Sequence, residues 1–106
     1  MAFTSILVTG GPYETPDGSV ATGEVRFRLT ASMRLGVVEI TDNPVVAHLD
    51  ATGSISQRLF ANDDVGVEPP NTAYAVTVAL DGAEPEVRYV RIPHAAAGGT
   101  VDLSAL

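Results

Sequence analysis

Two histidines are the residues best suited to acid–base chemistry in this chain. His48 lies two residues before Asp50 in a segment with strand character, and this spacing places both side chains on one face of a strand. Such a pair could act as acid and base, although the same pattern is more typical of a solvated strand face. His94 lies in a predicted loop, and no serine occupies the Gly-x-Ser-x-Gly turn that exposes a nucleophile. We therefore predict no catalytic residues and no enzymatic activity.

An acidic loop is the second candidate for chemistry. Asp63, Asp64 and Glu68 lie in the segment 61–72, and calcium binds about six to eight oxygen ligands of this kind. The spacing differs from the Asp-x-Asp-x-Asp-Gly pattern of helix-loop-helix calcium sites. Asn62 is more typical of an Asx turn, in a loop that the two aspartates solvate. We predict no metal site and no cofactor.

Three arginines form a candidate binding surface. Arg26, Arg28 and Arg34 are predicted to lie together on one face of a sheet. They could form ion pairs with Glu24 and Glu39, and each exposed pair contributes about 0–1 kcal/mol. They could instead contact an acidic partner protein, because arginine is enriched at protein interfaces.

The two ends of the chain extend this candidate surface. Residues 3–9 carry no charge, and residues 100–106 are almost as apolar. An uncharged edge strand is open to pairing with another chain, so each end is either internal to a sheet or covered by a partner. The end residues that we assign to partner binding are Phe3, Ile6, Val8, Val101 and Leu103.

Sugar binding is an alternative that rests on the aromatic residues. The chain has three tyrosines, three phenylalanines and no tryptophan, and they are dispersed along it. Phe27 and Tyr74 have the positions of core residues, because each shares its strand face with aliphatic side chains. Tyr13 and Tyr89 remain as residues that could stack on a sugar.

Strand signals recur along the chain, and helix signals are almost absent. Turns rich in Gly, Pro, Asn and Asp separate the predicted strands, which are 3–9, 24–30, 36–41, 45–49, 54–60, 73–80, 86–92 and 100–103. Two hairpins are predicted, 45–60 and 73–92, and the segment 61–72 is predicted to cross between sheets. Residues 95–97 could form one helical turn, which Gly98 and Gly99 would end.

This spacing of seven or eight short strands predicts one all-β domain over residues 1–106, a single antiparallel β-sandwich. The length suits one domain. The chain has no cysteine, which excludes disulfides, thiolate catalysis and cysteine-ligated metals. Its net charge of -7 argues against a nucleic-acid partner, and no apolar run is long enough for a membrane helix.

Several segments are similar to motifs of one protein group. Residues 49–56, LDATGSIS, resemble a run LDATGSFS, and residues 59–64, LFANDD, resemble LPATDD. Residues 70–82 and 92–103 resemble the later motifs of the same group, and residues 8–27 resemble the opening of such domains. The group comprises small immunoglobulin-like or transthyretin-like β domains in virion proteins of tailed phages that infect actinobacteria. The resemblance covers about residues 6–104.

The resemblance implies a structural virion protein without catalytic residues. The leading expectation is a capsid decoration or minor capsid protein on the outer head surface, assembled in the host cytoplasm. Its partners would be the major capsid protein or tail proteins, with no nucleic acid and no membrane, and it would be homo-oligomeric or multicopy. The alternatives are a tail, collar, baseplate or fibre component and a carbohydrate-binding host-adhesion module. Asn62 replaces a usual threonine, and a chain ending at Leu106 favours a stand-alone component over a fibre.

Overall fold

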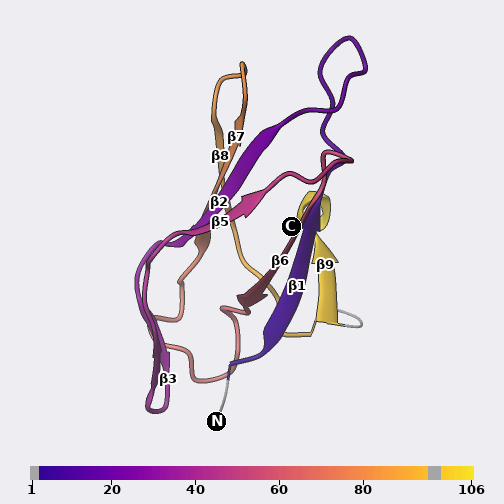
Figure 1. The fold of residues 1–106 in the computed structure, drawn as a ribbon. Coiled ribbons are helices and arrows are strands. Elements are labelled where there is room, and N and C mark those ends of the chain that lie inside the picture. The colour runs from indigo at the N-terminus through magenta and orange to yellow at the C-terminus, as the bar shows by residue number, and fades with distance from the viewer. Residues whose placement is uncertain (1–2, 96–98) are drawn as a thin grey trace.

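The computed structural model describes residues 3–95 and 99–106, and there it contains nine short strands in two facing sheets and one small hairpin (Figure 1). This confirms the predicted all-β sandwich. The strands are β1 (Ser5–Gly10), β2 (Gly23–Leu29), β3 (Met33–Leu35), β4 (Val38–Ile40), β5 (Val45–His48), β6 (Ile55–Phe60), β7 (Tyr74–Leu80), β8 (Glu86–Val90) and β9 (Thr100–Asp102), followed by a 3-10 turn, η2 (Leu103–Ala105).

The first sheet has three strands in the order β6-β1-β9, so the N-terminal strand β1 is central. β1 pairs with β6 in antiparallel register, with Val8 opposite Gln57. It pairs with β9 in parallel register, with Val8 opposite Val101. One pairing in this sandwich is therefore parallel. Both ends of the chain meet in this sheet, which explains why their apolar residues are internal.

The second sheet has four antiparallel strands in the order β5-β2-β7-β8. Phe27 of β2 lies opposite Val45 of β5 on one side and Val76 of β7 on the other. β7 and β8 form the predicted hairpin, in which Ala75 lies opposite Tyr89. Alternate residues of each strand point to opposite faces, so one face of the sheet covers the core and the other faces away from it.

The core lies between the two sheets. β2 shows the predicted alternation, with Val25, Phe27 and Leu29 buried and Arg26 and Arg28 exposed. Residues from both sheets and from the connecting segments complete one buried cluster: Phe3, Ile6, Val8, Met33, Leu35, Ala47, Ile55, Leu59, Ala61, Val67, Tyr74, Val76, Val90, Ile92 and Leu103. Burial of such side chains supplies the main driving force for this fold.

The predicted strand 36–41 is in part wrong. Gly36 and Val37 form the turn of a hairpin between β3 and β4, and Arg34 lies opposite Glu39. Gly36 has a φ of 62°, a left-handed conformation that glycine adopts without steric cost and that a strand residue does not. The hairpin ends in a fully exposed Val37.

The predicted hairpin 45–60 is wrong in topology, because β5 and β6 belong to different sheets. The turn between them is present. Gly53 donates its N–H to the Asp50 carbonyl oxygen at 3.0 Å, and Asp50 Oδ1 accepts the Thr52 N–H at 2.8 Å. Beyond this turn the chain passes from one layer of the sandwich to the other. A local turn signal carries no information on which sheet receives each strand.

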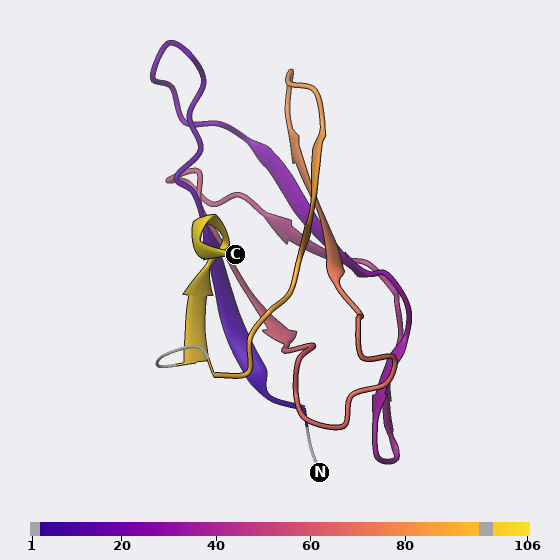
Figure 2. The same cartoon turned by 180° about the vertical axis from the view of Figure 1, so that it is seen from behind.

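The segment 61–72 crosses between the sheets as predicted, from β6 to β7. The paired ends of β7 and β8 extend beyond the body of the sandwich, as Figure 2 shows from behind, and the molecule measures 48 × 26 × 17 Å. The predicted helical turn at 95–97 falls mostly outside the described residues. None of the described helical segments has the length and hydropathy to cross a membrane.

Candidate partner-binding face

Four of the eight residues predicted to bind a partner lie in the core. Phe3, Ile6, Val8 and Leu103 are between 0% and 7% exposed. Because β1 pairs on both sides, no partner strand can add to it in this fold. Val101 on β9 is partly buried and packs against the same core. The prediction that the uncharged ends form a docking surface is therefore corrected: these side chains hold the two sheets together.

Arg26 and Arg28 lie on the outward face of the second sheet, whereas Arg34 does not join them. Arg34 belongs to the β3–β4 hairpin, and its backbone forms a bridge with Glu68 through hydrogen bonds of 2.8 and 2.9 Å. Two of the three predicted arginines thus share a face. The third is separated because its strand belongs to a different sheet.

The outward face of the second sheet is the best candidate for a binding surface. We call it the outer sheet face. Its strand register places Val46, Arg26, Thr77 and Val87 in one row across the four strands. The next row contains Arg28, Ala75 and Tyr89, and a third contains His48, Glu24 and Ala79.

Exposed apolar side chains flank the arginines on this face. Val46, Val87 and Tyr89 are 39%, 53% and 71% exposed. The short side chains of Ala75 and Thr77 leave a hollow of about 280 Å³ that also borders Arg26, Arg28, Pro44 and Val46. Sequence analysis missed Val46 and Val87. The alternation of β5 and β8 carried the signal, but only the sheet order showed that their outward residues share a face with the arginines.

Arg26 forms an ion pair with Glu24, two residues earlier on the same strand face. The arginine side chain remains 57% exposed. Arg26 thus forms one of the ion pairs that the sequence left open for the three arginines. Such an exposed pair contributes little to stability, and it leaves the Arg26 guanidinium available to a partner.

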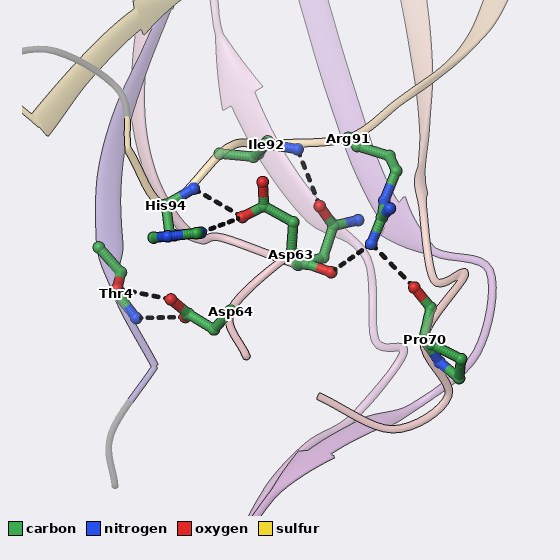
Figure 3. Close-up of polar contacts among 8 residues, drawn as sticks. Thr4, Asp63, Asp64, Pro70, Arg91, Ile92 and His94 are labelled. Carbon is green, nitrogen blue, oxygen red and sulfur yellow. Dashed lines mark hydrogen bonds and ion pairs between the residues drawn. The ribbon is translucent and has the colours of Figure 1, made fainter. Parts of the chain in front are cut away.

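A separate group of polar contacts fastens the loop that follows β6 (Figure 3). Asp64 accepts hydrogen bonds from the Thr4 N–H and the Thr4 hydroxyl, each at 2.9 Å. Asp63 Oδ1 accepts the His94 N–H at 2.6 Å and lies 2.9 Å from His94 Nδ1. These bonds connect the loop to two segments that are distant in the sequence: the one before β1, which contains Thr4, and the one after β8, which contains His94.

The Asp63–His94 contact shifts the titration of both groups. The hydrogen bond that the His94 imidazole donates to Asp63 raises the pKa of the imidazole against the opposing effect of desolvation. Partial burial acts to raise the pKa of the Asp63 carboxyl, but the backbone and imidazole bonds of His94 together bring it below its ordinary value. Both shifts favour the ionised pair.

Asn62 is fully buried and links three segments of the chain. Its Nδ2 donates to the Thr72 carbonyl oxygen at 2.6 Å, and its Oδ1 accepts the Ile92 N–H at 2.8 Å. Its backbone oxygen accepts a hydrogen bond of 2.8 Å from Arg91, which also donates to Pro70 (Figure 3). The predicted Asx-turn role is corrected, because the side-chain oxygen bonds a residue 30 positions away. No local sequence signal marks such a role.

The acidic loop is connected to three other segments of the chain. Asp63 and Asp64 bond His94 and Thr4 in different directions, while Glu68 bonds Arg34 through its backbone. Within residues 3–95 and 99–106, no three His, Asp or Glu side chains are grouped so as to hold a metal ion. The carboxylates of Asp63 and Asp64 connect the loop to Thr4 and His94.

The other predicted pair, His48 and Asp50, has no contact that would couple the two groups. His48 lies on the outer sheet face opposite Glu24. Asp50 accepts hydrogen bonds from Thr52 and Ser54, which lower the pKa of its carboxyl. β5 ends at His48, so the shared strand face on which the pairing was predicted does not extend to Asp50.

These observations define the chain as an all-β sandwich domain with one basic and apolar sheet face. None of the family models, curated proteins or solved structures with which the chain was compared matches it.

Proposed function

We propose that this chain is a structural component of a tailed-phage virion, a capsid decoration or minor capsid protein on the outer head surface. The outer sheet face would contact the major capsid protein. The role is non-enzymatic and requires no cofactor. The observation that carries the proposal is the grouping of Arg26 and Arg28 with exposed Val46, Val87 and Tyr89.

The composition of the outer sheet face supports protein binding. Arginine and aromatic residues are enriched in the central parts of protein interfaces, where lysine and glutamate are depleted. In a chain with a net charge of -7, two of the six basic residues lie side by side on this face. A partner with carboxylates beside apolar side chains would complement it.

The resemblance of residues 49–56 and 70–82 to actinobacterial phage virion domains supports the choice of partner. In the fold, the first segment forms the turn between β5 and β6, and the second forms β7 and the turn after it. The second motif therefore supplies a strand of the sheet that presents the outer face, and the first connects that sheet to the other one. Each copy on a lattice could bind through a modest individual contact.

The test is to locate the protein in purified phage particles by mass spectrometry and cryo-electron microscopy. We expect density for the sandwich on the head, with β2 and β7 toward the capsid surface. Density on the tail, collar or baseplate would support the alternative structural role. Absence from the particle would refute both.

Tyr89 favours a second candidate, a carbohydrate-binding module for host adhesion. Tyr89 is 71% exposed and lies opposite Ala75, which lines the hollow in the sheet, and exposed aromatic rings can stack on sugars. An array of host-envelope glycans would test this role, with Y89S as the variant that removes the ring. Y13S serves as the comparison, because Tyr13 packs partly against the core.

A further inference from the structure

We propose that two copies of this chain associate through β8, edge to edge, in an antiparallel pair centred on Val87. The partner is a second copy, and the two four-stranded sheets become one continuous sheet. β8 is an edge strand of the second sheet. Because β8 lies at the edge, one row of its backbone N–H and C=O groups faces away from β7. Residues 86–89 are also all exposed. This inference does not depend on a role in a virion.

Charge selects the register. In a two-fold antiparallel pair centred on Val87, Glu86 of each copy lies opposite Arg88 of the other. Both residues share the inner face of β8, because they are two positions apart. A pair centred on Glu86 or on Arg88 would place like charges directly opposite each other. Centring on Glu86 would also place Arg88 opposite Glu84, but around a Glu86–Glu86 contact; of the three registers, only the Val87 register forms two opposite pairs with no like pair.

The apolar residues of β8 support the same register. Val87 lies opposite Val87 of the second copy on the outer sheet face, where it is 53% exposed in the single chain. Tyr89 lies opposite Pro85 of the second copy, and its ring is 71% exposed in the single chain. The outer face is therefore compatible with the alignment that the charges select, and exposed apolar surface becomes covered.

Arg88 is anchored to the C-terminal segment by two hydrogen bonds. Its Nη2 donates to the Leu106 backbone oxygen at 2.6 Å, and its Nη1 lies 3.4 Å from that of Leu103. Arginine has five N–H donors, so these bonds leave donors for a carboxylate. A side chain that is already ordered loses less conformational entropy on pairing.

The extent of the contact predicts a weak dimer. Two five-residue strands bury less area than the roughly 1,200 Å² of a stable interface. We expect a monomer–dimer equilibrium that sedimentation velocity detects as the concentration of the purified chain rises. E86R and R88E should each weaken the dimer about tenfold or more, because each places like charges opposite at both symmetric positions.

The decisive measurement mixes the two charge-reversed variants. An equimolar mixture of E86R and R88E should form a heterodimer, since each reversed charge then faces its opposite. E86R keeps the hydrogen bonds from Arg88 to the backbone oxygens of Leu103 and Leu106, so this variant remains informative if R88E fails to fold. R58E has the same charge change as R88E and lies on β6 in the other sheet; it should dimerise like the unmodified chain. Monomers at every concentration, or a dimer that neither reversal affects, would overturn the proposal.

A cross-link tests the position of the axis. Directly opposed residues in an antiparallel pair have Cα atoms about 4.5–5.5 Å apart, within the range that a disulfide spans. The chain has no cysteine, so V87C introduces a single thiol on the two-fold axis. Under mild oxidation V87C should form a disulfide dimer, whereas V46C, exposed on the opposite edge strand, should not. Equal cross-linking of V87C and V46C would contradict the register.

Discussion

Tyr74 joins the two sheets of the sandwich through a hydrogen bond of 2.7 Å from its hydroxyl to the backbone oxygen of Phe60. Tyr74 begins β7 in the second sheet, and Phe60 ends β6 in the first. The tyrosine is 4% exposed, and its burial raises the pKa of the phenol. The bond connects the two ends of the segment 61–72, which crosses between the layers.

We expect Y74F to lower the free energy of unfolding by about 1 kcal/mol, because it keeps the buried ring and removes one hydrogen bond. In a domain of this size the melting temperature should fall by about 4–8 °C. Urea denaturation and calorimetry would measure both values. Y89F is the matched control, since Tyr89 is exposed and should tolerate the loss of its hydroxyl. Equal stability of Y74F and the unmodified chain would show that the bond contributes nothing.

Asn62 should be more sensitive than Tyr74. N62A leaves the Ile92 N–H and the Thr72 carbonyl without the bonds that Asn62 provides in the interior. Each buried polar group that loses its partner costs about 1–3 kcal/mol, so we expect a loss of at least about 2 kcal/mol in the free energy of unfolding. N71A changes an exposed asparagine in the same connection and should have little effect. Comparable losses in both variants would contradict the role of the Asn62 amide.

The Asp63–His94 pair should make stability depend on pH. The imidazole has its pKa raised above 6.5 in the fold, so its contribution is complete below about pH 6.5 and is lost as the pH rises through the raised value. The carboxyl has its pKa lowered from 3.8, so its contribution is present above about pH 4 and is lost as the pH falls through the lowered value. The pair therefore stabilises the fold most between about pH 4 and 6.5.

A double-mutant cycle isolates this contribution. Thermal unfolding of the unmodified chain, D63N, H94N and D63N/H94N at pH 5 and pH 8 gives the coupling between the two side chains at each pH. We expect a favourable coupling at pH 5 that decreases by pH 8. The backbone N–H of His94 keeps its bond in H94N, so the cycle reports the imidazole. A coupling of the same size at both pH values would rule out the ion pair.

Particle binding tests the outer sheet face. If the domain decorates a capsid, R28E should reduce its binding to particles that lack it, because a basic group facing an acidic partner becomes a repulsive one. Binding of the unmodified domain should weaken with added salt. R58E carries the same charge change on β6, in the other sheet, and should bind normally. If R58E and R28E bind equally, the outer sheet face is not the contact.

The strands were accessible to sequence analysis because their side chains alternate. The pattern of β2, with Val25, Phe27 and Leu29 inward, matches the structure, and so does the first part of β7, where Tyr74 and Val76 are buried. Their faces follow from local geometry and burial alone. The turn that Asp50 and Gly53 form was predictable for the same reason, since its bonds lie within five residues.

The candidate site was only partly predictable. Arg26 and Arg28 were assigned to a shared face because they are two residues apart on one strand. The place of Arg34 outside this face depends on the sheet order, which the sequence did not reveal. The same holds for the places of Val46 and Val87 beside the arginines. The uncharged ends were open to two interpretations. Only the pairing of β1 with both β6 and β9 placed them inside.

The sequence by itself determined an all-β chain, its turns, and the inward and outward residues of its main strands. These depend on interactions between residues near each other in the chain. The tertiary structure decided which sheet each strand joins, the burial of Asn62, and the link between Tyr74 and Phe60. Those features depend on contacts between segments far apart in the chain, from 14 positions for Tyr74 and Phe60 to 93 for Val8 and Val101, whose geometry is fixed only when the strands pair and the two sheets pack.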